Sequence, residues 1–131
     1  MATKIFINLH VSDLNASIDF FTKLGFAFDA DLTSDDAGCM VIDERIYALL
    51  VTEPFFRTIT GREPADTAVA QEVALALEVA GRERVDELAD AAVSAGGQAS
   101  GEPQDEGFMY SRSFRDLDGH LWSVLHMPAT A

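Results

Sequence analysis

The sequence is short of cysteine, of basic residues and of long apolar runs, and each shortage excludes a class of protein. Cys39 is the only cysteine among 131 residues, so the chain cannot form an intrachain disulfide or a zinc site built from several thiolates. Cys39 lies in the apolar stretch GCMVI with no basic neighbour, and we expect a packed, unreactive thiol. A reducing cytoplasm suits such a protein.

Basic residues are outnumbered, since 9 Lys and Arg stand against 22 Asp and Glu, for a formal net charge of −13. Proteins hold nucleic acid and anionic membranes through clustered Lys and Arg, so we expect neither as a partner. No apolar run approaches the roughly 18 residues that a membrane helix needs, and Asn8 and His10 interrupt the N-terminal one. These absences predict an untargeted, cytoplasmic protein.

The residues that are present describe a globular chain with a repeated pattern. Apolar residues make up 48% and charged residues 24% of the sequence, which is typical of one compact domain spanning residues 1–131. The first half begins with an alternating, strand-like stretch at 4–11. Leu14, Ile18, Phe21 and Leu24 then recur at helical spacing and end at Gly25. Three further strands are predicted at 26–32, 38–42 and 46–53.

The second half repeats this plan. It predicts a strand at 72–79 and a helix at 82–95, which Gly96 and Gly97 end. Shorter strands follow at 98–100, 108–114 and 120–127, the last two joined by the turn DLDG. Each half therefore reads βαβββ, with one module at about residues 1–60 and the other at about 71–131. Such modules cannot close their own sheets, so their pairing would form a curved sheet around a cavity.

The stretch at about 54–70, with two of the four prolines and Gly61, is predicted to be a linker between the modules. It carries three apolar residues that are not expected to be exposed, Phe55, Phe56 and Ile59. They would cover the cavity or lie in a subunit interface. We favour the interface, and therefore expect a homodimer.

Three segments together resemble one known family. HVSDLNASIDFFTKLGF opens the first module, VDELADAAVSAGG forms the helix of the second, and GFMYSRSFRDLDGHLWSVLHM closes the chain. With this separation they are similar to the vicinal oxygen chelate superfamily of glyoxalases, bleomycin resistance proteins and extradiol dioxygenases. The resemblance covers essentially the whole chain. It implies an α+β fold in which two paired βαβββ modules form an open, U-shaped sheet around a cavity, often in a homodimer.

In metal-dependent members, the resemblance implies one carboxylate, histidine or glutamine ligand from each of four strands. Three of those positions fall on Phe6, Ala74 and Ser123 here, and the fourth lies near residues 50–53, where Glu53 is the one carboxylate. Phenylalanine and alanine offer no lone pair, and a neutral serine hydroxyl is a poor ligand for a divalent metal. We therefore expect no metal or other cofactor. Without the ion, glyoxalase-type isomerisation and extradiol cleavage lose their Lewis acid.

The remaining polar residues suggest a ligand site. Asn8 and His10 share a strand face with Phe6, where His10 would be a general base, a donor to a ligand or a hydrogen-bonded residue of the rim. Tyr110 and Arg112 alternate with Ser111 and Ser113, so the strand turns either the Tyr and Arg side or the serine side to the cavity. On the first side they would clamp a carboxylate or phenol, or Arg112 would pair with an acidic residue. The predicted ligand-binding residues are Asn8, His10, Tyr110, Arg112, Phe6 and Ser123.

Other histidines and carboxylates have structural explanations. His120 and His126 share the parity of Trp122 and are expected to lie at the surface or in packing contacts, while Asp116 and Asp118 suit the turn. A substitute metal site from His10 with Glu53 or Asp116 is a weaker reading.

Three functions compete. The favoured one is a metal-independent protein that binds a small molecule and performs no reaction. The alternative is a glyoxalase- or dioxygenase-like metalloenzyme with a relocated or degenerate metal site, or one that uses His10 without metal. The third is a structural dimer module without a ligand.

Overall fold

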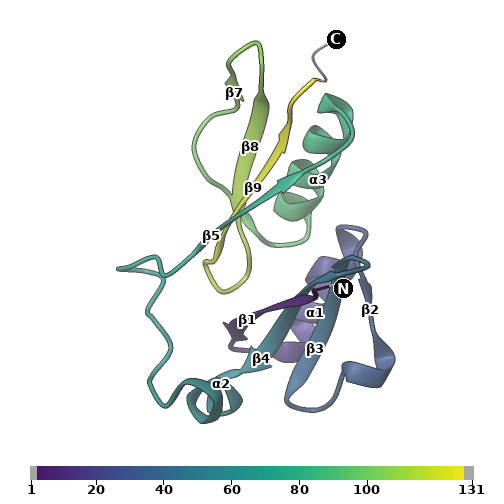
Figure 1. The fold of residues 1–131 in the computed structure, drawn as a ribbon. Coiled ribbons are helices and arrows are strands. Elements are labelled where there is room, and N and C mark those ends of the chain that lie inside the picture. Colours follow the sequence, from purple (N-terminus) through teal and green to yellow (C-terminus); the bar gives the residue numbers. More distant parts are fainter. Residues whose placement is uncertain (1–2, 129–131) are drawn as a thin grey trace. The chain divides into compact units, whose positions relative to one another are not determined.

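The computed structural model describes residues 3–128, and the chain divides into two compact units at Ala65 and Asp66 (Figure 1). The first unit contains β1 (Ile5–Val11), α1 (Leu14–Lys23), β2 (Ala27–Phe28), a 3₁₀ turn (Ala30–Leu32), β3 (Ala37–Asp43), β4 (Ile46–Thr52) and α2 (Glu53–Thr60). Its four strands lie in the order β1-β4-β3-β2. β1 runs parallel to β4, and the other neighbours are antiparallel.

The second unit repeats this arrangement. Its elements are β5 (Ala74–Glu78), α3 (Arg82–Ser94), β6 (Gln98–Ala99), β7 (Gln104–Asp105), β8 (Tyr110–Arg115) and β9 (Leu121–His126). The strand order is β5-β9-β8-β6, with the short β7 also pairing with β8. The first and last strands again run parallel to each other. The α+β class and the repeated βαβββ module predicted from the sequence are thereby confirmed.

Each long helix packs its apolar stripe on one face of its own sheet. In α1, the side chain of Asp13 caps the start by accepting from the Ala16 amide at 3.1 Å, and Phe20 and Phe21 are buried. Gly38 of β3 lies so close to the Ile18 side chain of α1 that a Cβ there would crowd it. In α3, the buried residues are Val85, Leu88, Ala89 and Ala92. The face of each sheet opposite α1 or α3 is called the distal face below.

Two segments differ from the sequence expectation. Residues 53–60, expected to lie in a linker, form the helix α2. Pro54 does not prevent it because it occupies the first turn, where its missing N–H costs no helical hydrogen bond, and Gly61 ends the helix with a φ of 73°. The strand expected at 26–32 is reduced to β2, because the carboxylate of Asp29 accepts from the Asp31 amide at 2.9 Å and starts the 3₁₀ turn.

Among residues 3–128, the helices are all too short or too polar to cross a membrane.

Candidate functional site

The distal face of the first sheet carries three of the residues predicted to bind a ligand. In the register of β1 and β4, Phe6 pairs with Tyr47, Asn8 with Leu49 and His10 with Val51. Directly paired residues point to the same side of a sheet. Leu50 lies between Leu49 and Val51 in β4 and pairs with Gly38, which packs on α1. Leu50 therefore points toward α1, and its two neighbours point away from it. Phe6, Asn8 and His10 therefore share one row on the face away from α1, as the alternation in the sequence predicted.

The exposed end of this row is aromatic. The rings of Phe6 and Tyr47 stack with centroids 4.8 Å apart and an interplanar angle of 10°. Phe6 is 42% exposed, whereas Tyr47 is 9% exposed and donates its hydroxyl to the Glu44 carbonyl at 2.9 Å. The ammonium group of Lys4 lies 5.8 Å from the Tyr47 ring centroid. The pair thus presents a supported aromatic surface to solvent.

The other end of the row is covered. Asn8 is half-buried, and its amide Nδ2 donates to the Phe6 carbonyl at 3.3 Å. His10 is 8% exposed and meets the edge of the Phe56 ring, with ring centroids 5.3 Å apart. Phe56 belongs to α2 and is itself buried against Ala37 and Val51. His10 therefore lies beneath α2, while Phe6 and Asn8 remain on the accessible part of the row.

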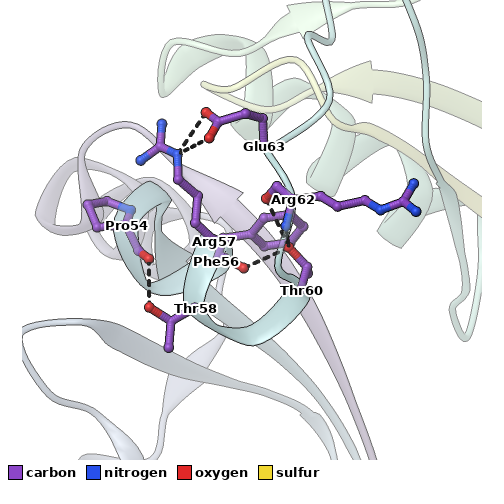
Figure 2. A network of polar contacts seen from close by, with 7 residues as sticks. All are labelled: Pro54, Phe56, Arg57, Thr58, Thr60, Arg62 and Glu63. Atoms are coloured by element: carbon purple, nitrogen blue, oxygen red, sulfur yellow. Dashed lines mark hydrogen bonds and ion pairs between the residues drawn. The ribbon is translucent and has the colours of Figure 1, made fainter.

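A network of polar contacts within residues 54–63 stabilises α2 and its end, as Figure 2 shows. The hydroxyl of Thr60 donates to the Phe56 carbonyl at 2.9 Å and accepts from the Arg62 amide at 3.2 Å. The guanidinium of Arg57 pairs with both carboxylate oxygens of Glu63, at 2.7 and 2.8 Å. The Thr60 bonds satisfy backbone groups at the end of a helix of only eight residues. The Phe56 ring itself is placed beside His10 by its packing against Ala37 and Val51.

The distal face of the second sheet carries small side chains at its centre, with Leu121, Leu125 and Arg115 toward its ends. The register pairs Ser123 with Ser113 on one side and with Ala76 on the other. The hydroxyls of Ser113 and Ser123 lie 2.8 Å apart and share a hydrogen bond. Ala74 lies on the same face, two residues before Ala76. Of the two orientations that the sequence left open for this strand, the structure has the serine side on the distal face.

Tyr110 and Arg112 consequently lie on the face that packs against α3. The Tyr110 hydroxyl donates to Asp86 Oδ1 at 2.6 Å, and the Arg112 guanidinium contacts the carboxylates of Asp86 at 3.2 Å and Asp90 at 2.9 Å. The hydrogen bond from Tyr110, followed by that from Arg112, lowers the pKa of the Asp86 carboxyl. These contacts fasten β8 to α3, and they place Tyr110 and Arg112 on the opposite side of the sheet from Ser123.

The turn between β8 and β9 is organised by one buried carboxylate. Asp116 accepts from the backbone amides of Asp118 and His120 and from the indole nitrogen of Trp122, each at 3.0 Å. Burial raises the pKa of the Asp116 carboxyl, against the effect of His120 and of these N–H donors. His120 is buried, and His126 Nδ1 lies 2.9 Å from the Val79 carbonyl. The turn and packing roles expected for these residues match the contacts found.

The residues at the positions where the family resemblance implies metal ligands do not suit a divalent metal ion. Phe6, Ala74 and Ser123 lie on distal faces, but none of them brings a carboxylate, imidazole or thiolate. Within residues 3–128, no three His, Cys, Asp or Glu side chains are gathered as a metal site requires. Cys39 is fully buried, and burial, with the nearby charge of Asp29, raises the pKa of its thiol. It is a packing residue, as expected.

Sequence reasoning missed two residues of the first distal face. Tyr47 was assigned to a strand, but only the register of β1 against β4 shows that its ring lies under Phe6. Phe56 was recognised as unusual for a linker, yet nothing in the linear pattern indicates that it covers His10. The available signal for Phe56 was its position next to Phe55, which gives a short helix two adjacent aromatic side chains.

A family model described as the Glyoxalase/Bleomycin resistance protein/Dioxygenase superfamily matches residues 5–124. No curated protein matched the chain.

Several solved structures share its fold. A hypothetical protein from S. aureus is 29% identical, with a TM-score of 0.82 over 96% of this chain and 95% of that one. A glyoxalase/bleomycin resistance protein/dioxygenase family enzyme from Burkholderia phytofirmans is 16% identical, with a TM-score of 0.82 over 97% and 100%. The fosfomycin resistance protein FosX from Listeria monocytogenes is 18% identical, with a TM-score of 0.69 over 100% and 95%.

Proposed function

The chain belongs to the glyoxalase/bleomycin resistance protein/dioxygenase superfamily, and we propose that it is a member that binds a small molecule without a metal ion and performs no reaction on it. The ligand class that suits it is planar and partly polar.

The observation that carries this proposal is the chemistry of Phe6, Ala74 and Ser123. The resemblance to metal-dependent members assigns metal ligands to these three positions, and all three lie on distal faces of the sheets. A phenyl ring and a methyl group cannot coordinate an ion, and Ser123 shares its hydroxyl with Ser113 at 2.8 Å. A reaction that needs a Lewis acid has no support from this set of residues.

The stacked pair Phe6 and Tyr47 supports ligand binding. A planar ligand laid on the exposed part of Phe6 would extend the stack, and the neighbouring Asn8 offers an amide for a polar substituent. His10 forms the covered end of the row under Phe56. We leave Tyr110 and Arg112 outside the proposed surface, because their polar atoms are bonded to Asp86 and Asp90.

The experiment combines metal analysis with a binding screen. The protein is purified without chelators, its metal content is measured by elemental analysis, and indole, quinoline and 2-naphthol are titrated with and without EDTA. We expect no stoichiometric metal and the same affinities in both conditions. About one tightly held metal ion per chain, or binding that EDTA abolishes, would overturn the metal-independent function in favour of the metalloenzyme.

We further propose that the protein is a cytoplasmic homodimer. Two apolar side chains of α2 support this proposal, since Ile59 is 48% exposed and Phe55 is only half-buried. Phe56 is excluded from the interface because it packs within its own unit. The buried thiol of Cys39 suits a reducing compartment.

A further inference from the structure

A pocket of about 580 Å³ lies in the second unit, at the end of β8. It contains none of the residues of the proposed binding surface on β1. Its lining comes from the start of the unit, from β6 and from the turn between β8 and β9, and includes Thr67, Gln98, Arg115, Leu117, Asp118 and Gly119.

Arg115 is held in the pocket wall by neutral groups. Its Nη1 donates to the Gly119 carbonyl at 3.0 Å and to the side-chain oxygen of Gln71. Among the described residues, these two acceptors are the only ones bonded to its guanidinium, and both are reached from one nitrogen. The second edge of the planar group, formed by Nε and Nη2, is therefore left for another acceptor.

Arg45, Arg62 and Arg115 form no ion pair among the described residues, and of these three only Arg115 is half-buried. Four other arginines lie against carboxylates: Arg57 with Glu63, Arg82 with Asp105, Arg84 with Glu87, and Arg112 with Asp86 and Asp90. In residues 3–128, no carboxylate lies within ion-pair distance of Arg115, although the full chain has 22 acidic residues. A half-buried guanidinium without a counter-charge favours an anion that offers two oxygens to its fork.

The rest of the pocket lining is held by close local contacts and is partly apolar. The Thr67 hydroxyl donates to the Asp118 carbonyl at 2.6 Å, and Gly119, with a φ of 82°, lies so close to Thr67 that a Cβ would not fit. Leu117 is 40% exposed and provides an apolar surface beside the arginine. Asp118 adds one negative charge to the lining, which repels an anion of charge −2 more strongly than one of charge −1.

From this arrangement we propose that the pocket is a second binding site, separate from the surface on β1, for a small organic monocarboxylate. The carboxylate pairs with the free edge of Arg115, and its apolar remainder lies on Leu117. An apolar tail distinguishes such a ligand from an inorganic anion, which gains nothing from Leu117.

The test uses the full chain, labelled with ¹⁵N, and titrates it with benzoate, benzamide and inorganic phosphate. The readouts are the NMR shifts of the Gly119 and Leu117 amides and of the Arg115 side-chain N–H. We expect saturable benzoate binding with a Kd on the order of 1–10 mM, as for a small ligand held by one ion pair and a modest apolar contact. Benzamide, which has the same ring without the charge, should bind at least tenfold more weakly, and so should phosphate.

Variants distinguish an effect of the Arg115 charge on benzoate binding from an effect on folding. Arg115→Gln should weaken benzoate binding at least tenfold, and Arg62→Gln, which removes the same charge from the first unit, should not change it. If Arg115→Gln fails to fold, Leu117→Asp replaces it, because this exposed position tolerates substitution and the new carboxylate would neutralise Arg115. Leu117→Asn is its neutral control.

Three results would overturn the proposal. They are shifts that do not saturate at ten times the expected Kd, equal binding of benzamide or phosphate, and an unchanged affinity in Leu117→Asp. The β1 surface is unaffected by any of these results.

Discussion

The ring of Phe6 lies on the ring of Tyr47, with centroids 4.8 Å apart, on adjacent parallel strands of the first sheet. The two rings differ in their exposure to solvent. Tyr47 is buried and anchored by its hydroxyl to the Glu44 carbonyl, whereas nearly half of Phe6 is in solvent. Tyr47 supports the fold beneath, and Phe6 is the ring that we propose meets a ligand.

Replacing Phe6 with alanine should therefore weaken the binding of planar probes and cost only a modest part of the folding stability. A stacked aromatic pair contributes about 0.5–1.5 kcal/mol, so we expect the Kd for indole or 2-naphthol to rise about twofold to tenfold. The free energy of unfolding should fall by about 1 kcal/mol, since the side chain is only partly buried. Phe108→Ala, at a 68% exposed phenylalanine of the second unit, is the control. Equal effects of both variants on the Kd would contradict the proposed surface.

Removing the Tyr110 hydroxyl should change the titration of Asp86. The hydrogen bond from Tyr110 is the largest cause of the lowered pKa of Asp86, so Tyr110→Phe should move this pKa up toward its ordinary range. A folded pKa below the unfolded one stabilises the protein at neutral pH, and this contribution is lost as the pH falls through the folded pKa. The stability difference between wild type and Tyr110→Phe should therefore shrink in acid.

NMR titration of the Asp86 carboxyl carbon and unfolding curves at several pH values measure this effect. Tyr47→Phe is the control, because its hydroxyl bonds to a backbone carbonyl and not to a carboxylate. An unchanged Asp86 pKa in Tyr110→Phe would show that Arg112 alone holds the carboxylate.

Asp116→Asn should destabilise the second unit through one specific bond. The amide oxygen can still accept from the backbone of Asp118 and His120, but the amide nitrogen cannot accept from the Trp122 indole. An unsatisfied buried donor costs about 1–3 kcal/mol in the free energy of unfolding. Trp122→Phe and the double variant complete a cycle by denaturant unfolding. If the two effects simply add, the bond between Asp116 and Trp122 does not carry the cost.

Ile59→Glu should dissociate the proposed dimer without unfolding the chain. Ile59 is 48% exposed, so the change should alter the stability of the monomer by no more than about 0.5 kcal/mol. Light scattering of the variant should give a monomer at micromolar concentration, where the unmodified protein gives a dimer. Val93→Glu, at a similarly exposed position of α3, is the control and should remain dimeric. A monomeric unmodified protein refutes the interface.

Much of the fold could be predicted because the alternation and helical spacing are clear in both halves. The stripe of Leu14, Phe21 and Leu24 identifies α1, and the alternation in residues 4–11 gives the correct side for Phe6, Asn8 and His10. The sequence pattern does not predict the helix α2, because two prolines, Gly61 and scattered charge are typical of a linker. At the first turn of a helix, however, proline loses no hydrogen bond.

The site was harder to predict because it depends on which face of a strand is covered. Alternation separates Tyr110 and Arg112 from Ser111 and Ser113, but it does not say which set meets the helix. The bulk of Phe114, which shares the parity of Tyr110 and is buried, was the clue to the covered side. The stack of Phe6 on Tyr47 depends on register, and register between distant strands is not encoded in either strand alone.

The parallel pairing of the first and last strands within each module also constrains how the chain folds during synthesis. Ile5 pairs with Ile46, and Ala74 pairs with Leu121, so each opening strand acquires its partner only when nearly the whole module has left the ribosome. Contacts between such distant residues are slow to form because the intervening chain must close first. For the second module the partner strand is at the C-terminal end, so deletion of residues 121–128 would leave β5 without the strand it pairs with. A nascent chain arrested before this point would therefore hold one completed sheet and one with its central strand missing.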